Sequence, residues 1–287
     1  MGPMTARGTL FVVATPIGNL EDLSPRALAV LRGAAAIYCE DTRVTGKLAA
    51  RFGLTAPRVS CHAHNEGSRI AGLLERLARG ESVALVSDAG TPALSDPGQH
   101  AVAAAAQAGH AVVAVAGPSA GAAALSISGL PAVPHLFAGF PPAKPGARRA
   151  FFERMAARTE TIVYFEAPHR LAASLADAAR IFGPRRAVVA RELTKIHEEA
   201  VRGTLEEIRD RVAARASVLG ECVVVIEGAP PAGEEATPAD VDEAIAGLER
   251  QGLSGRQISK EVARTTGIPA RTIYARLLER KTEPGPE

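Results

Sequence analysis

The chain has 287 residues, of which 47% are hydrophobic and 22% are charged, and its formal net charge is +2. This length and apolar content suffice for two or three domains with buried cores, and the balanced charge excludes nucleic-acid binding through overall charge alone. Three cysteines, Cys39, Cys61 and Cys222, are too few and too scattered for a disulfide framework or a zinc knuckle, so we expect reduced, buried thiols. Apolar stretches stay well short of the roughly 18 residues of a membrane helix. We therefore expect a cytoplasmic protein that makes no contact with a membrane.

The first 130 residues alternate short β-rich runs with longer Ala- and Leu-rich segments of helical periodicity. We expect strands at residues 9–14, 36–40, 58–62, 83–87 and 111–116. This alternation predicts a mainly parallel sheet, in which ligands bind where the strands end and the loops to the helices begin. The loop "DAGTPALSDPG" (88–98) should lie at that edge, with Asp96 capping the helix that follows it.

A second block of strands and helices runs from about residue 136 to 228, and a linker rich in Pro, Gly and acidic residues follows it. We expect its strands at 136–140, 161–166, 186–192 and 221–228. After the linker, two helical segments flank a turn that contains Gly267 and Pro269, which predicts a helix-turn-helix. Its apolar side would consist of Ile258, Val262, Ile268, Ile273 and Leu277. The predicted domains are an N-terminal α/β domain (1–130), a C-terminal α/β domain (131–229) and a helical tail (238–283).

Common nucleotide and metal signatures are missing from the sequence. It contains no G-x-G-x-x-G after the first strand, no G-x-x-x-x-G-K-[ST] and no H-E-x-x-H. His62 and His64 have no third ligand nearby in the sequence, so we expect no metal. The strand-end loops instead contain small residues, Gly and Pro, which let the backbone approach a ligand closely and would suit a mostly uncharged molecule.

Eight short blocks, taken in chain order, carry a resemblance to a known family. They are "VATPIGNLEDLS", "CEDTR", "HNE", "LVSDAGTPALSDPG", "GPSA", "FEAPHR", "RELTK" and "GECVVVIEG". Together they resemble the tetrapyrrole methylase superfamily, and within it the bacterial methyltransferases that modify the 2′-hydroxyl of a cytidine in small-subunit ribosomal RNA. The resemblance covers about residues 9–228, and the tail is similar to the small helix-turn-helix extension of those enzymes.

The resemblance implies a two-domain α/β fold, a homodimer, and S-adenosylmethionine bound in a cleft between the domains. Carried over by motif, the cofactor-binding residues are Pro16, Asp88, Ala89, Gly90, Thr91, Ser119, Phe165, Glu166, Ala167, Glu192 and Leu193. The alternatives are purely structural: "DAGTPALSDPG" would be only a long turn, and Glu166 would only cap the next helix. The sequence has "SDAGTP" where the corrin and porphyrin relatives carry a Gly-Asp-Pro turn, which puts a tetrapyrrole substrate in doubt.

Methyl transfer to a ribose hydroxyl depends more on alignment than on acid–base help. In-line positioning can supply on the order of 7–11 kcal/mol of the barrier, whereas a general base contributes roughly 10²–10⁴-fold in rate. The base can therefore be modest, and the candidates are Glu66, Asp41 and Lys144. Asp41 could equally be a helix cap that forms a surface ion pair.

Two segments could contact RNA. The segment 141–158 contains Lys144, Arg148 and Arg149, although an ordinary solvated helix face would look the same. Residues 250–281 of the tail carry eight Lys or Arg against two Glu, and Arg271 and Arg276 belong to its second helix.

These patterns favour methylation of a cytidine 2′-hydroxyl, with 16S ribosomal RNA of the small ribosomal subunit as partner. The alternatives are a small-molecule methyltransferase that acts on a tetrapyrrole and a ligand-sensing transcription regulator with a DNA-binding tail. The regulator is disfavoured because the second tail helix offers few base-reading side chains.

Overall fold

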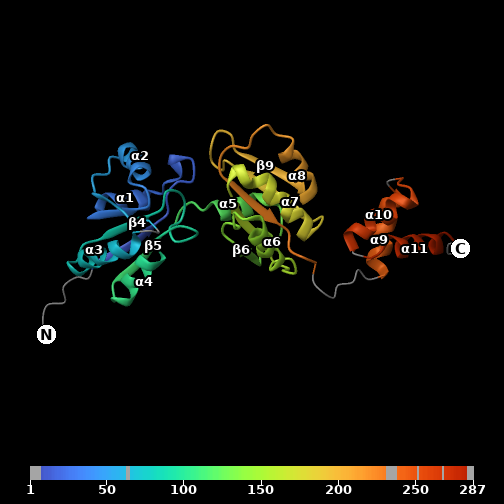
Figure 1. Cartoon of the computed structure of the whole chain (residues 1–287), viewed down its shortest axis with the longest axis horizontal. Coiled ribbons are helices and arrows are strands. Elements are labelled where there is room, and N and C mark those ends of the chain that lie inside the picture. Colours follow the sequence, from blue (N-terminus) through green and yellow to red (C-terminus); the bar gives the residue numbers. More distant parts are fainter. Residues whose placement is uncertain (1–7, 63–64, 231–237, 251, 267, 283–287) are drawn as a thin grey trace. The chain divides into compact units, whose positions relative to one another are not determined.

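A computed structural model describes residues 8–62, 65–230, 238–250, 252–266 and 268–282. Contacts divide the chain into two compact units (Figure 1). One comprises Met1–Met155 and Glu160–Glu227, and the other comprises Ala156–Thr159 and Gly228–Glu287. Within the described residues, the helices are too short or too polar to cross a membrane.

The first sheet is entirely parallel, as the sequence predicts, and its strand order is β3-β2-β4-β1-β5. The strands are β1 (Thr9–Val13), β2 (Ala36–Cys39), β3 (Arg58–Ser60), β4 (Val83–Val86) and β5 (Ala111–Val115). The helices between them are α1 (Pro25–Gly33), α2 (Thr42–Phe52), α3 (Glu66–Ala78) and α4 (Gln99–Gln107). Because every crossover returns the chain to the same end of the sheet, the loops after β1, β2, β4 and β5 share one edge.

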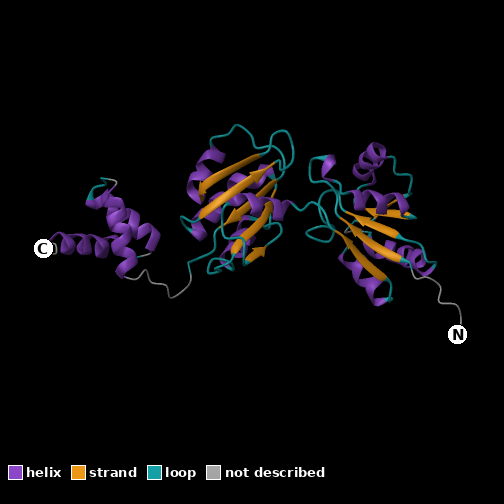
Figure 2. Cartoon of the chain, turned by 180° about the vertical axis from the view of Figure 1, so that it is seen from behind, coloured by secondary structure: helices purple, strands orange, loops and turns teal. Residues whose placement is uncertain are grey.

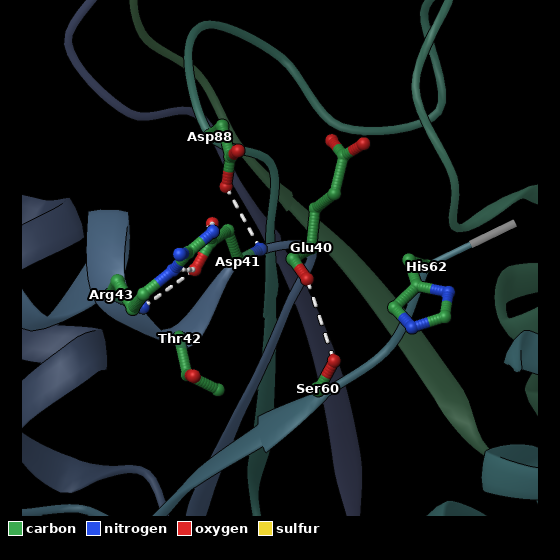
Figure 3. Close-up of a pocket in the computed structure, with 7 residues that line it drawn as sticks. All are labelled: Glu40, Asp41, Thr42, Arg43, Ser60, His62 and Asp88. Atoms are coloured by element: carbon green, nitrogen blue, oxygen red, sulfur yellow. Dashed lines mark hydrogen bonds and ion pairs between the residues drawn. The ribbon is translucent and has the colours of Figure 1, made fainter.

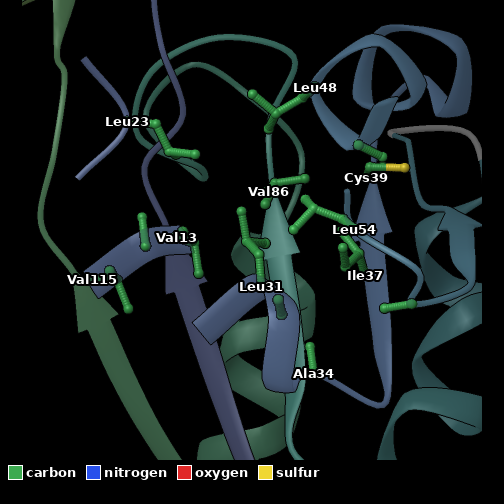
Figure 4. Close-up of a cluster of buried hydrophobic side chains, with 14 residues drawn as sticks. Val13, Leu23, Leu31, Ala34, Ile37, Cys39, Leu48, Leu54, Val86 and Val115 are labelled. Atoms are coloured by element: carbon green, nitrogen blue, oxygen red, sulfur yellow. The ribbon is translucent and has the colours of Figure 1, made fainter. Parts of the chain in front are cut away.

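Both faces of this sheet are buried, which explains why its central strands are apolar throughout. One face packs against Leu31 of α1 and Leu48 of α2, together with alternate strand residues such as Val13 and Val86 (Figure 4). The other face packs against Leu73 of α3 and Ala101 of α4. With cores on both sides, the strands and their end loops have little freedom to shift.

The second sheet is mixed, with the order β6-β7-β10-β8-β9 (Figure 2). Its strands are β6 (His135–Phe137), β7 (Thr161–Glu166), β8 (Arg186–Arg191), β9 (Glu199–Thr204) and β10 (Cys222–Ile226). β6 runs parallel to β7, and the remaining pairs are antiparallel. Sequence patterning missed β9, because this edge strand has the polar sequence "EAVRGT" and lacks an apolar run.

Helix α5 (Ala120–Ser128) lies with the second sheet, although the sequence division at residue 130 assigned it to the first domain. Its Ala124 and Leu125 share a hydrophobic cluster with Val163, Val188 and Val223 of that sheet. The hydrophobic core around the second sheet therefore begins before residue 131.

A buried ion pair joins two helices that cover the second sheet, α6 (Pro145–Glu153) and α7 (Leu171–Phe182). The guanidinium of Arg148 lies 2.8 Å from the carboxylate of Asp177, and the two side chains are 6% and 15% exposed. Helix α8 (Leu205–Ala213) completes this layer and begins with a capping box formed by Thr204 and Glu207. Arg148 was expected to contact RNA, but the structure commits its side chain to the protein interior.

The tail contains three helices, α9 (Pro238–Arg250), α10 (Gly255–Thr266) and α11 (Ala270–Thr282). The predicted apolar residues of α10 and α11 pack with Val241 and Ile245 of α9. Arg276 of α11, expected to contact RNA, instead pairs with Asp242 of α9 at 2.7 Å, and Arg280 pairs with the same carboxylate at 3.2 Å. Arg276 therefore braces the tail.

We predict that Asp177→Ala lowers the free energy of unfolding by about 3 kcal/mol, because it leaves the Arg148 guanidinium buried without its carboxylate. Arg148→Met should lower the free energy of unfolding by less, because it removes the buried guanidinium itself and so leaves no buried positive charge without its carboxylate. Chemical denaturation of both variants measures the difference. Equal losses in the two variants would contradict this account of the pair.

Candidate active site

Two main-chain hydrogen bonds join the ends of β1 and β4. The Thr15 N–H donates to the Gly90 carbonyl at 2.9 Å, and the Gly90 N–H donates to the Thr15 carbonyl at 3.0 Å. Gly90 has φ +78°, and a Cβ there would lie 3.4 Å from Cγ2 of Ile17. A glycine is favoured here because the backbone is left-handed.

The loop after β5 (117–119) joins the same edge. The Thr91 hydroxyl donates to the Pro118 carbonyl at 3.2 Å. Ser119 stands before α5, yet its hydroxyl makes no capping bond to the helix. The structure thus brings together the loops that contain Pro16, Gly90, Thr91 and Ser119, and the Ala89 carbonyl accepts a hydrogen bond from the Ser87 hydroxyl at 3.2 Å.

Asp88 links the ends of β4 and β2 (Figure 3). Its Oδ1 accepts a hydrogen bond from the Asp41 N–H at 3.0 Å, and burial raises the pKa of the Asp88 carboxyl. The Asp41 side chain caps α2 through the Arg43 N–H and pairs with the Arg43 guanidinium at 2.6 Å. Hydrogen bonds from Arg43 hold the pKa of Asp41 at about 2. Asp41 is therefore a cap with a surface ion pair and a poor proton acceptor.

An open pocket of about 390 Å³ lies beside this link. Glu40, Asp41, Thr42, Arg43, Ser60, His62 and Asp88 line it (Figure 3). Burial, and then the charge of Asp88, raise the pKa of the Glu40 carboxyl. Polar side chains of both charge signs suit a ligand with several hydroxyl groups. The sequence did not identify Glu40, Ser60 or His62 as site residues, but Glu40 follows β2, Ser60 ends β3 and His62 lies just beyond it.

The loop 88–98 has an unusual backbone. Ala93 and Ser95 have φ +65° and +71°, conformations that are costly for residues with a side chain and that concentrate at functional sites. Asp96 lies in the same loop, and its pKa is raised to about 6 by burial and next by the charge of Glu40. The expectation that Asp96 caps α4 is wrong, because the N-cap residue is Gly98.

The carboxylate that binds the first turn of α4 belongs to Glu66. It is 5% exposed, and its Oε1 accepts a hydrogen bond from the Ala101 N–H at 2.9 Å. This carboxylate holds α3 and α4 together, so the structure gives it a structural position in place of the catalytic one expected. Lys144, the third candidate base, is exposed at the N-cap position of α6.

The loop 192–195, which follows β8 of the second sheet, contacts the loop that follows β1. The Asn19 N–H donates to Oγ1 of Thr194 at 3.0 Å, and a Cβ on Gly18 would lie 2.8 Å from the Leu193 carbonyl oxygen. Leu193 shares a hydrophobic cluster with Ile17. Glu192 has φ +52°, and its carboxylate is occupied by Lys195 Nζ at 2.8 Å. Leu193 therefore lies near the Pro16 loop, whereas the Glu192 side chain serves its own loop.

The end of β7 contributes an aromatic residue and a buried carboxylate. Phe165 packs against Phe137 and Phe140 with ring centroids 4.9 and 5.5 Å away. The Glu166 side chain is fully buried, pairs with Arg170 at 3.0 Å and accepts a hydrogen bond from the Ala167 N–H at 2.9 Å. Glu166 thus fixes the turn that leads into the short helix Pro168–Arg170, but it does not cap that helix as the structural alternative proposed, because the N-cap residue is Ala167 and no side chain caps it.

The cysteines are free and buried, as expected, and burial raises the pKa of Cys61 and Cys222 to about 11. Among the residues that the structure describes, no three His, Cys, Asp or Glu side chains are grouped to hold a metal ion.

Comparisons with known proteins show which family and which relatives the chain resembles. The profile of the Tetrapyrrole (Corrin/Porphyrin) Methylases matches residues 9–209. The chain is 47% identical over 273 residues to ribosomal RNA small subunit methyltransferase I of Xylella fastidiosa strain Temecula1, with 94% of this chain and 99% of that protein covered. It is 45% identical over 277 residues to the Pseudomonas aeruginosa protein of the same name, with 96% and 98% covered. Uroporphyrin-III-C-methyltransferase from Thermus thermophilus shares the fold, with a TM-score of 0.55, 22% identity, and 77% of this chain and 94% of that one covered.

We predict that Asp96→Asn stabilises the protein at pH 7 and flattens its stability profile between about pH 4 and 6. Because the folded-state pKa of about 6 exceeds the ordinary value of 3.8, the folded protein holds a proton that the unfolded chain has released in this range. The parent therefore loses stability as the pH rises through it. Melting temperatures from pH 4 to 8 measure the effect.

The control is Asp210→Asn, since a hydrogen bond from Arg209 lowers the pKa of this surface carboxyl. It should give no gain at pH 7. A parallel gain in both variants would show that burial of Asp96 is not the cause.

Proposed function

Because the chain belongs to the tetrapyrrole (corrin/porphyrin) methylase family, whose methyl donor is S-adenosylmethionine, we propose that it methylates small-subunit ribosomal RNA. The finer proposal is that the acceptor is the ribose 2′-hydroxyl of a cytidine in 16S ribosomal RNA. The observation that carries the RNA substrate is similarity over almost the whole chain, tail included, to relatives named ribosomal RNA small subunit methyltransferase I.

The converging loops fit S-adenosylmethionine, which supplies a reactive methyl group when bound. Pro16, Gly90, Thr91, Ser119 and Leu193 offer main-chain groups, hydroxyls and apolar surface in place of charge. Neutral contacts avoid stabilising the positively charged ground state of the donor, which would slow transfer. Because Gly90 has no Cβ, no side chain covers its main-chain atoms. The remaining motif residues, Asp88, Ala89, Phe165, Glu166, Ala167 and Glu192, would act mainly by shaping these loops.

The acceptor hydroxyl must lose a proton as its oxygen forms the new bond to carbon. Asp41 and Glu66 are engaged by Arg43 and by the Ala101 N–H, so neither carboxylate is well placed to take it. Glu40 lines the open pocket, and its raised pKa makes it a better acceptor at neutral pH. We therefore assign proton acceptance to Glu40, with Lys144 as the alternative that the sequence suggested.

Lys144, at the N-cap of α6, and Arg149, which is partly exposed although it lies 3.9 Å from the Asp177 carboxylate, would contact RNA phosphates, and Arg271 is an exposed basic residue of α11. Arg148 and Arg276 are excluded from this role by their ion pairs with Asp177 and Asp242. The small ribosomal subunit is the proposed partner, and the proposed assembly is a homodimer.

A methyl-transfer assay with isotopically labelled S-adenosylmethionine tests this function. The protein is incubated either with 30S subunits or with a porphyrinogen, and labelled RNA is digested to nucleosides. We expect label in 2′-O-methylcytidine from 16S ribosomal RNA. Label in the porphyrinogen alone would establish the small-molecule alternative, and binding of the donor without any transfer would favour the regulator.

We predict that Asp88→Ala weakens binding of S-adenosylmethionine about 3- to 10-fold while the fold is retained. The variant loses the hydrogen bond from the Asp41 N–H, which contributes about 0.5–1.5 kcal/mol to holding the two loops in place. Calorimetric titration measures the affinity. Asp22→Ala, at an exposed carboxylate on the loop after β1, is the matched control and should bind normally. Unchanged affinity in a folded Asp88→Ala variant would remove Asp88 from the site.

A further inference from the structure

One face of α11 presents a basic, an aromatic and an aliphatic side chain to solvent. Arg271, Tyr274 and Leu278 follow one another at intervals of three and four residues, so they share one side of the helix. Tyr274 is 41% exposed and Leu278 is 52% exposed, although both are large apolar side chains. Exposed aromatic surface beside a cation is typical of a site that binds a planar ligand.

The other sides of α11 are already occupied. Ile273 and Leu277 are buried in the core of the tail. Arg276 and Arg280 pair with Asp242 of α9. Two residues correspond to a rotation of about 200° around a helix, so Arg276 points away from Tyr274. The Arg271–Tyr274–Leu278 face is therefore the exposed side of α11.

A pocket of about 280 Å³ adjoins this face. It is lined by Ser254, Gly255, Arg256, Tyr274, Leu277 and Leu278. The aromatic ring lies beside the backbone at the start of α10, since a Cβ on Gly255 would be in ordinary van der Waals contact, 3.5 Å, with Cε2 of Tyr274. Ser254 is engaged with Gln257 through its hydroxyl, at 2.6 Å, and through its N–H. Arg256 is exposed at the rim.

We propose that this pocket binds an unpaired nucleotide of single-stranded RNA, with the base against Tyr274 and Leu278 and the phosphates near Arg256 and Arg271. The proposal rests on the proposed function, from which it takes RNA as the substrate class. Stacking of a base on an aromatic ring combined with nearby cations is the general mode of single-strand recognition.

Charge and size both favour this occupant. Residues 250–281 carry eight Lys or Arg against two Glu, and with the four acidic residues of α9 the three helices still keep a small basic surplus, which favours a phosphate backbone over a basic partner. The pocket volume lies just below the range of about 300–1,000 Å³ found for small-ligand sites, which suits one base better than the side of a folded protein.

The test measures binding of the full-length protein to a fluorescent 12-nucleotide oligoadenylate and to a strand of the same length without bases. Tyr274→Ala should weaken oligoadenylate binding about 5- to 100-fold, the range expected for the loss of one stacked base. It should leave binding of the abasic strand unchanged. Tyr274→Phe keeps the ring and should bind oligoadenylate like the parent.

Matched charge variants test the phosphate contact. Arg256→Gln should weaken binding of both strands, and more than Lys260→Gln does, since Lys260 is exposed on the same helix but does not line the pocket. Circular dichroism checks that each variant retains its helices.

Unchanged oligoadenylate binding in folded Tyr274→Ala would overturn the proposal, as would an equal loss for the abasic strand. The methyl-transfer assay separates this outcome from failure of the proposed function. If the parent methylates 30S subunits while Tyr274→Ala binds oligoadenylate normally, only the nucleotide site falls. If the parent transfers no methyl group while the Tyr274 effect holds, the RNA site stands and the proposed function falls.

Discussion

The main-chain pairing of Thr15 with Gly90 is the contact on which the rest of the candidate active site depends. It joins the ends of two neighbouring parallel strands that would otherwise continue into separate loops. Ile17 reaches Leu193 from one side of this contact, and Thr91 reaches the Pro118 carbonyl from the other. Because the sheet is buried on both faces, these loops are held at a fixed edge, and small residues are needed where they meet.

Much of the fold follows from the sequence, because hydrophobic periodicity and the positions of Gly and Pro depend on neighbouring residues. The five strands of the first sheet and the helices between them appear where the pattern predicts. The tetrapyrrole methylase resemblance is confirmed by the family match over residues 9–209. Edge strand β9 was not predicted, because a strand exposed along one side need not be apolar. The sheet on which α5 packs was assigned wrongly, because an Ala-rich helix can pack on either sheet.

The roles of charged residues were much harder to predict, since each depends on a partner remote in sequence. Arg148 meets Asp177, Arg276 meets Asp242, and Glu66 meets the Ala101 N–H, all about thirty residues away along the chain. From sequence alone, a basic residue beside a Pro-rich loop could bind phosphate or complete an ion pair. Neutral motif residues such as Gly90 and Thr91 were predicted through the family resemblance, although their partners Thr15 and Pro118 are also remote in sequence.

The ion pairs that engage the arginines limit how RNA could be held. In the first unit, several arginines near the candidate site are committed to carboxylates, for example Arg43 to Asp41 and Arg170 to Glu166. A site built this way can align an acceptor hydroxyl but contributes few free cations to overall affinity. The tail (238–283) is nearly balanced as a whole, with eight Lys or Arg against seven Asp or Glu, but its basic residues are concentrated in residues 250–281, where an exposed tyrosine also lies. Positioning and affinity would then reside in separate units, so that the substrate could be gripped firmly without placing strong positive charge beside the methyl donor.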